Sequence, residues 1–165
     1  MLVSSGLIGL PIASLEHTFQ VFDIQTLRYP QVLTHLGLKA SIEWLAVDAM
    51  NNMGLDVKAG IDKRFTLASD EMQMFVFDAV RELLLNVVKH AKVNKAEVRV
   101  SSVARGMVRI QVKDMGVGID TRESTSASHF GLFRIQERAE SFGGRLEVVS
   151  QPEKGTCVSI ILPSH

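Results

Sequence analysis

The spacing of apolar residues alternates between two periods along this chain of 165 residues, and the alternation limits which elements the chain can form. Helical spacing predicts helices over 31–53, from about 70 to 91 and over 132–142, and period-two spacing predicts strands over 55–61, 98–100, 108–112, 145–150 and 157–163. The order α-β-α-β-β-α-β-β predicts an α+β fold. We expect a two-layer α/β sandwich in which helices cover one face of a mixed, mainly antiparallel sheet.

Turn and cap residues mark the limits of these elements. Pro30 ends any helix that arrives from the N-terminal side, so residues 1–29 are expected to form a segment separate from a domain at 30–165. Gly54 is expected to end the first helix, and Ser69 is expected to cap the second.

The charge balance and the cysteine content exclude several classes of function. Eighteen basic and eighteen acidic side chains give a formal net charge of zero, which provides no general attraction for nucleic acid or for an anionic membrane. Charges interrupt every apolar run before the roughly 18 residues that a bilayer span needs. No Lys or Arg precedes Arg28, so the N-terminal segment lacks the positively charged region with which a signal peptide begins. Cys157 is the single cysteine, so an internal disulfide cannot form. We expect a cytoplasmic protein with no nucleic-acid partner and no membrane contact by this segment.

A polar strip runs along the second predicted helix, on the side away from its apolar face. On a helical wheel the apolar face contains Val80, Leu83, Leu84, Val87 and Ala91, and the strip contains Glu82, Asn86, Lys89 and His90. One interpretation is a solvated helix face. However, Asn86 is a poor helix former in mid-helix, and its amide oxygen is a suitable ligand for a hard cation such as Mg²⁺. Lys89 is placed to meet a phosphate as a point charge.

Two further motifs follow the hairpin. In the sequence DMGVG, Asp114 is an acceptor-only carboxylate suited to an exocyclic amine, and Gly116 and Gly118 allow close approach of a ligand to the backbone. A simple Asp-Gly turn is the alternative. After a polar loop, Gly131 is expected to open the third helix and to offer free N–H groups to a phosphate; a plain loop-to-helix junction is the alternative.

Taken together, these motifs resemble those of a known family. ELLLNVVKHA, DMGVG, the Gly131-Leu132 helix start with its ERA and GG, and KGTCVSIILP resemble the N-box, G1 box, G2 box and closing strand of sensor histidine kinase ATP-binding domains. These domains belong to the GHKL superfamily and have the Bergerat fold. LRYPQVLTHLGLKASIEWLA resembles the linker to the dimerisation helices in the subfamily that pairs with helix-turn-helix response regulators. The resemblance covers residues 27–163.

The resemblance implies a role for each matching residue. Glu82 matches the catalytic acid that orients or activates the acceptor or a water, and Asn86 matches the residue that binds Mg²⁺. Asp114 matches the residue that reads the adenine amine of ATP. Lys89 and His90 match positions near the phosphates, and Gly116 and Gly118 match residues that shape the pocket. Thr156 matches a residue that supports the aspartate. Gly131 and Leu132 match the end of the ATP lid and the start of the helix after it.

The function implied is that of the catalytic domain of a two-component sensor kinase, which transfers the γ-phosphoryl of Mg-ATP to a histidine outside this chain. Its partners would be the dimerisation and phosphoacceptor domain of a homodimeric parent kinase, cytosolic or membrane-bound, and a response regulator. Alternatives are an anti-sigma-factor-type serine kinase and a degenerate nucleotide-binding interaction module.

Some positions depart from the family pattern. His129 occupies the first glycine position of the lid, and Arg134 and Ile135 stand where Gly and Met are common. None of the five histidines is followed by an acid in an acceptor context. We therefore expect residues 1–29 to be a remnant of a dimerisation helix or a linker, and the acceptor to lie elsewhere.

Overall fold

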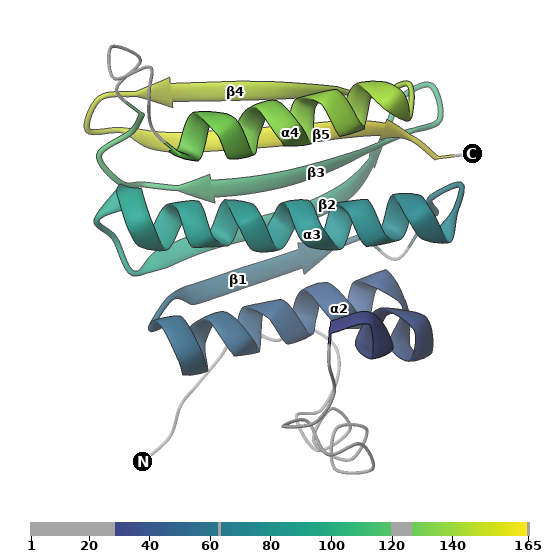
Figure 1. The fold of residues 1–165 in the computed structure, drawn as a ribbon, viewed down its shortest axis with the longest axis horizontal. Helices are drawn as coiled ribbons and strands as arrows, with labels where there is room; N and C mark the ends of the chain where they lie inside the picture. Colours follow the sequence, from purple (N-terminus) through teal and green to yellow (C-terminus); the bar gives the residue numbers. More distant parts are fainter. Residues whose placement is uncertain (1–28, 63, 120–126, 165) are drawn as a thin grey trace.

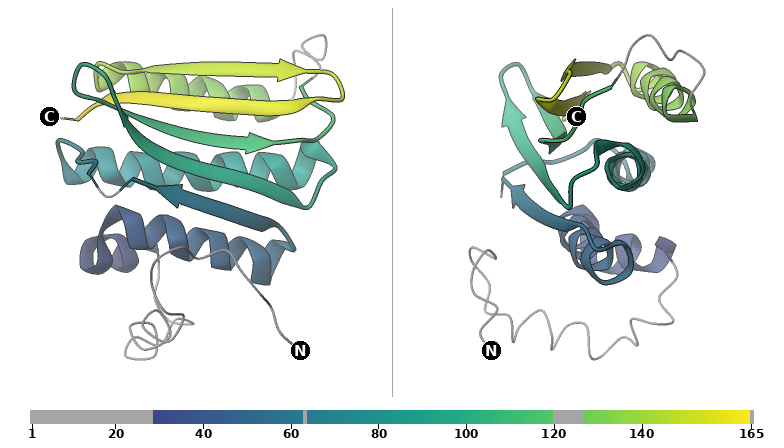
Figure 2. Two further views of the ribbon diagram at one scale, coloured as in Figure 1. Left: turned by 180° about the vertical axis from the view of Figure 1, so that it is seen from behind. Right: turned by 90° about the vertical axis from the view of Figure 1, so that its left-hand side faces the viewer.

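The computed structural model describes residues 29–62, 64–119 and 127–164, which form a sheet with helices packed on one face (Figure 1). The described elements are α2 (Tyr29–Met53), β1 (Asp56–Ile61), α3 (Asp70–Asn86), the π-helical turn η1 (Val87–Ala91), β2 (Lys95–Val103), β3 (Met107–Asp114), α4 (Ala127–Ser141), β4 (Arg145–Gln151) and β5 (Gly155–Pro163). Viewed along the layers, all three α-helices lie on the same side of the strands (Figure 2). The predicted two-layer architecture and element order are therefore confirmed.

The sheet has the order β1-β2-β3-β5-β4. β1 pairs with β2 in parallel, whereas the β2–β3, β3–β5 and β4–β5 pairs are antiparallel. A parallel pair needs a crossover connection, which α3 supplies here. The sheet is thus mixed and mainly antiparallel, as predicted.

α2 is interrupted, which corrects the prediction of one continuous helix over 31–53. Gly37 has φ 76° and ψ 170°, outside the helical region, so two helical segments meet there. The Ser41 hydroxyl donates a hydrogen bond of 2.8 Å to the Gly37 carbonyl at this break. Gly54, with φ 66°, follows the helix as predicted.

α3 begins at the predicted cap but does not stay regular to residue 91. Ser69 accepts a hydrogen bond of 3.1 Å from the Met72 N–H. The last turn widens into the π-helical turn η1, whereas the helical wheel assumed a regular α-helix to residue 91. The predicted apolar face is nevertheless confirmed, since all five of its residues are buried: Val80, Leu83, Leu84, Val87 and Ala91.

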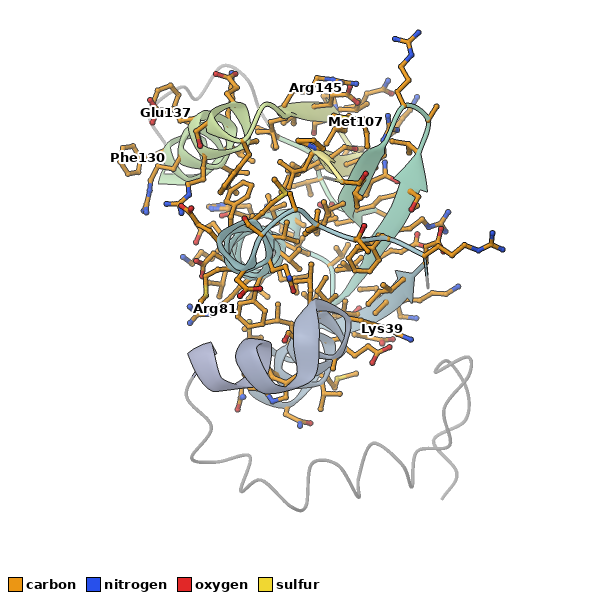
Figure 3. The ribbon with its side chains drawn as sticks, turned by 90° about the vertical axis from the view of Figure 1, so that its right-hand side faces the viewer. Lys39, Arg81, Met107, Phe130, Glu137 and Arg145 are labelled. Atoms are coloured by element: carbon orange, nitrogen blue, oxygen red, sulfur yellow. The ribbon has the colours of Figure 1, made fainter. Side chains whose placement is uncertain are left out.

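The core lies between this helical face and the inner face of the sheet (Figure 3). Alternate residues of β3, Val108, Ile110 and Val112, are buried, as period two requires. Their register partners on β5, Leu162, Ile160 and Val158, are buried as well. The middle strands therefore anchor the helices to the sheet.

α4 begins four residues before the predicted position. The helix starts at Ala127, so Gly131 is its fifth residue and lies within the helix. The prediction that Gly131 opens the helix and offers free N–H groups to a phosphate is therefore wrong. Residues 120–126, which belong to the polar loop before this helix, lie outside the described residues.

The junction of α4 and β4 leads to a test of packing. A methyl group at Gly144 would overlap the Ile161 carbonyl and approach Leu162 Cδ2 at 2.8 Å. Gly144→Ala should lower the free energy of unfolding by about 1–3 kcal/mol through overpacking. Gly60→Ala is the matched control, because a methyl group there meets nothing within 4 Å. Urea unfolding of both variants tests this; equal stability would contradict the close approach of the Gly144 backbone to β5.

Candidate functional site

The end of the α3–η1 helix is joined directly to the turn that follows β3. The Ala91 carbonyl accepts a hydrogen bond of 3.0 Å from the Val117 N–H. A Cβ at Gly116 would overlap this carbonyl, so only glycine permits the approach. π-helical turns are frequent at functional sites, and this one ends at the residue that receives the turn. The structure thus joins the end of the helix that carries the polar strip to the turn of the DMGVG motif.

Asp114 lies at the end of β3 and is 6% exposed. Its Oδ1 accepts a hydrogen bond of 2.8 Å from the Gly116 N–H, so the simple turn that was the alternative interpretation is present. A carboxylate has several acceptor positions on its two oxygens. Holding the turn is therefore compatible with accepting a bond from a ligand amine.

A hydroxyl pair ties β4 and β5 to the same loop; Thr156 was predicted as a site residue, whereas its partner Ser150 was not. Ser150 Oγ accepts a hydrogen bond of 2.8 Å from the Ile119 N–H and donates one of 3.2 Å to the Gly155 carbonyl. Thr156 Oγ1 lies 2.9 Å from Ser150 Oγ, and since that hydroxyl has one proton, Thr156 is the donor in this arrangement. Ser150 becomes recognisable only once the register pairs it with Thr156.

Glycines again allow the backbone segments to approach in this region. Gly118 has φ 80°, and a Cβ there would overlap the Gln151 carbonyl. Gly155 has φ 85°, and a Cβ there would overlap the Asp114 carbonyl. The positive φ that was expected to be possible at Gly118 is present, and its role in shaping a ligand pocket stays a prediction. Gly155 is a position that the sequence did not reveal.

Glu82 faces α4. A Cβ at Gly131 would lie 2.9 Å from Glu82 Oε1, so the missing side chain lets the two helices approach at this carboxylate. Leu132 is half-buried against the core. Asn86 follows Glu82 by one helical turn and is half-buried.

Lys89 and His90 stand apart from this arrangement. Both lie on η1, and both are exposed. Neither forms a hydrogen bond or ion pair with any residue that the structure describes. Their proximity to phosphates remains a prediction.

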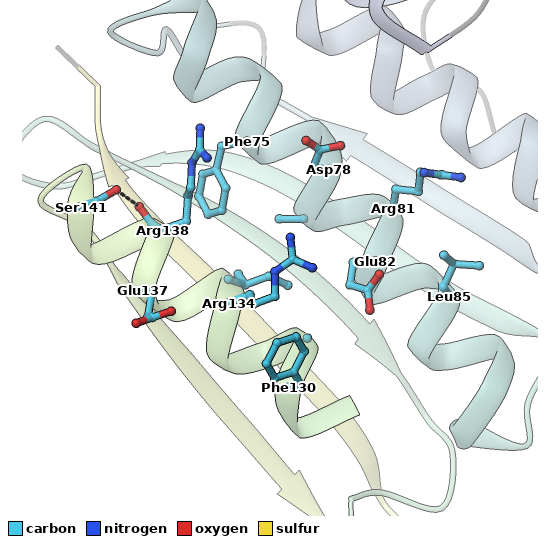
Figure 4. A pocket seen from close by; sticks show the side chains of 13 residues that line it. Phe75, Asp78, Arg81, Glu82, Leu85, Phe130, Arg134, Glu137, Arg138 and Ser141 are labelled. Carbon is cyan, nitrogen blue, oxygen red and sulfur yellow. Dashed lines mark hydrogen bonds between the residues drawn. The ribbon is translucent and has the colours of Figure 1, made fainter. Parts of the chain in front are cut away.

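A groove of about 760 Å³ separates α3 from α4 (Figure 4). Its apolar floor includes Phe75, Ala79 and Ile135, which are 6%, 2% and 5% exposed. Charged side chains line its walls: Asp78, Arg81 and Glu82 on α3, and Arg134, Glu137 and Arg138 on α4. The groove is therefore apolar at its base and carries charges of both signs at its rim.

Residues 71–165 match the family described as histidine kinase-, DNA gyrase B- and HSP90-like ATPases. The match covers more than half of the chain, so the chain belongs to this family and is an ATP-binding domain. Among the residues described, no helix is long and apolar enough to cross a bilayer.

Two similar sequences are named as a sensor and a sensor-like histidine kinase. The chain is 32% identical over 164 residues to the sensor histidine kinase NarS of Mycobacterium tuberculosis, covering 98% of this chain and 36% of NarS. It is 31% identical over 153 residues to an uncharacterised sensor-like histidine kinase of Chloroflexus aurantiacus, covering 86% of this chain and 25% of that protein. The chain thus spans well under half of either relative. Within the family, it is an ATP-binding catalytic domain of the sensor histidine kinase type.

Solved structures show the same fold. The histidine kinase AdeS of Acinetobacter baumannii has a TM-score of 0.63 at 15% identity, covering 93% of this chain and 77% of that one. Full-length ShkA, solved in complex with AMPPNP, has a TM-score of 0.65 at 16% identity, covering 76% of this chain and 30% of that one. The predicted fold class is therefore confirmed.

The groove contains a carboxyl group with a shifted pKa. Asp78 is an exposed residue, yet partial burial of its carboxyl group raises its pKa above the ordinary value of 3.8, while Arg81, Arg138 and Arg134 act in the opposite direction. The folded chain therefore holds this proton more tightly than the unfolded chain does. The stability that this contributes is complete below pH 3.8 and is lost as the pH rises through the folded pKa.

Replacing the Asp78 carboxyl group by a neutral amide should remove the loss of folding stability that occurs as the pH rises. Asp78→Asn is expected to raise the midpoint of thermal unfolding at pH 7, and the difference from the unchanged chain should disappear toward pH 3. Calorimetric scans at both pH values measure this. A lower midpoint at pH 7 would show that the three arginines outweigh the cost of burial.

Proposed function

We propose that this chain binds Mg-ATP and transfers its γ-phosphoryl group to a histidine outside the chain, from which a response regulator receives it. The observation that carries the proposal is the Val117–Ala91 hydrogen bond, which places the Asp114 turn against the helix bearing Glu82 and Asn86. Relatives named as sensor histidine kinases favour this function over a serine kinase of the anti-sigma-factor type. The parent kinase would be a homodimer that works in the cytoplasm.

Asp114 would select the base. Its carboxylate accepts a bond from the adenine amine, Thr156 supports it, and Gly116 and Gly118 keep the pocket wall close to the ligand. Guanine has a carbonyl oxygen where adenine has the amine, so a carboxylate would face a second acceptor there. The pocket would therefore prefer ATP to GTP.

Asn86 would hold the metal together with the nucleotide. Among the described residues, no group of three or more His, Cys, Asp or Glu side chains forms a metal site. Mg²⁺ needs no such cage, because it commonly binds through one or two protein oxygens, phosphate oxygens and waters. One amide oxygen at Asn86 fits this requirement. When bound, the ion supplies charge neutralisation for the phosphates.

Glu82 would position the acceptor histidine. Its carboxylate can accept a hydrogen bond from one imidazole nitrogen, which leaves the other nitrogen to attack the γ-phosphorus as ADP departs. Lys89 and His90 would attract the phosphates from the exposed turn η1. Gly131 and Leu132 would serve as the helical support of the lid rather than as its N-terminal anion site.

Asn86→Ala tests the metal assignment. The variant should lose about 10- to 100-fold in ATP affinity with Mg²⁺ present and much less in EDTA, because the lost contact is to the ion. Calorimetric titration in both buffers measures the difference. Asn52→Ala, on exposed α2 surface, is the control. Equal losses in the two buffers would remove Asn86 from the metal site.

Asp114→Ala tests the selection of the base. A hydrogen bond to a charged group contributes about 1.5–3 kcal/mol, so ATP affinity should fall roughly 10- to 150-fold and the preference over GTP should largely vanish. Asp114→Asn separates the two roles, because its amide oxygen can still accept the Gly116 N–H. That variant should keep its stability and still lose the preference. Unchanged discrimination in both variants would place the base elsewhere.

A further inference from the structure

The arginines that line the groove differ in their partners. Arg138 forms an ion pair of 3.0 Å with Glu71 and lies 5.8 Å from the centre of the Phe142 ring. Arg134, one turn earlier on α4, forms no ion pair or hydrogen bond with any residue that the structure describes. Its influence on the pKa of Asp78 ranks after those of Arg81 and Arg138. Arg134 is therefore a cation on the wall of the groove with no ion pair among the described residues.

The Arg134 guanidinium extends from α4 across the groove toward α3, where Asp78 and Glu82 project (Figure 4). These two acids are four residues apart and so lie on the same side of the helix, one turn from each other. Asn86 lies one further turn along, and it does not line the groove. Arg134 thus faces the stretch of α3 from Asp78 to Glu82, and the proposed metal position at Asn86 lies beyond that stretch.

We propose that Arg134 is a specificity-determining residue that pairs with a carboxylate on the helix presenting the acceptor histidine. This inference rests on the proposed function, in which that histidine approaches Glu82. A helix that brings an imidazole to Glu82 must pass the groove beside it, where Phe75, Ala79 and Ile135 form an apolar floor. A carboxylate of the incoming helix that lies over the rim of the groove would meet Arg134. A Lys or Arg at the same position, with no acid beside it, would be repelled.

The nucleotide phosphates are the other anions within the proposed site. An α-helix rises 1.5 Å per residue, so Asp78 and Asn86 are separated by about 12 Å along α3. A phosphate bound through a metal at Asn86 lies toward η1, whereas Arg134 points to the stretch between Asp78 and Glu82. The position of Arg134 therefore favours the acceptor over ATP.

The test measures transfer in trans. Full-length parent kinase carrying Asn86→Ala supplies the acceptor histidine, and the isolated chain supplies the nucleotide site with γ-labelled ATP. Arg134→Gln in the chain should raise the KM for the acceptor roughly 5- to 30-fold, with the affinity for ATP unchanged. Arg134→Lys should retain most of the activity, and added salt should weaken the unchanged chain more than the Gln variant.

The control is Arg64→Gln, an exposed arginine that follows β1 at the end of the sheet remote from Asp114. It should change neither KM nor ATP affinity. Arg134→Glu should abolish most transfer, and changing one Asp or Glu within a turn of the acceptor histidine to Lys should restore it. An unchanged KM in Arg134→Gln, or a loss confined to ATP affinity, would overturn this inference. No transfer by the unchanged chain would instead contradict the proposed function.

Discussion

One backbone hydrogen bond, from the Val117 N–H to the Ala91 carbonyl, sets the relation between the two halves of the candidate site. Ala91 ends a helix whose last carbonyls have no partner within the helix. Val117 lies in the loop after β3, where the N–H groups no longer pair with a neighbouring strand. The bond satisfies both groups, and it forms only because Gly116 has no Cβ. The core already packs this helix against β3, and the bond adds a direct link between the end of the helix and the turn that carries Asp114.

The opposite side of the loop is held in the same way, by close backbone approaches and hydroxyl groups. Gly118 and Gly155 adopt positive φ and pass against the carbonyls of Gln151 and Asp114, while Ser150 bonds the Ile119 N–H. These contacts use few large side chains, which leaves the loop surface open for a ligand. The wall behind Asp114 is consequently built from main chain, and its shape depends on where side chains are absent.

Apolar spacing predicted the element order and the buried face of α3, because those features follow from a pattern repeated over many residues. The misses were local. Gly37 interrupts α2, and η1 widens the last turn of the second predicted helix. α4 begins four residues before Gly131, within the polar loop, where there are no regularly spaced apolar residues to mark a helix. Asp114 and Gly118 were found because their motif is contiguous. Ser150 was missed because its partners lie in other strands and become neighbours only through the register.

α3 serves both partners of the proposed reaction, and this arrangement explains where specificity can vary. Asn86 and Glu82 stand one turn apart on the same helix, whose other face is fixed in the core by Val80, Leu83 and Leu84. The distance between the proposed metal position and the proposed acceptor position is therefore set by a rigid element. α4 contacts α3 at Glu82 through Gly131 and near the start of α3 through the Arg138–Glu71 ion pair, and its outward positions are free of the core. A charge such as Arg134 can thus change which acceptor is received while the nucleotide side of α3 stays as it is.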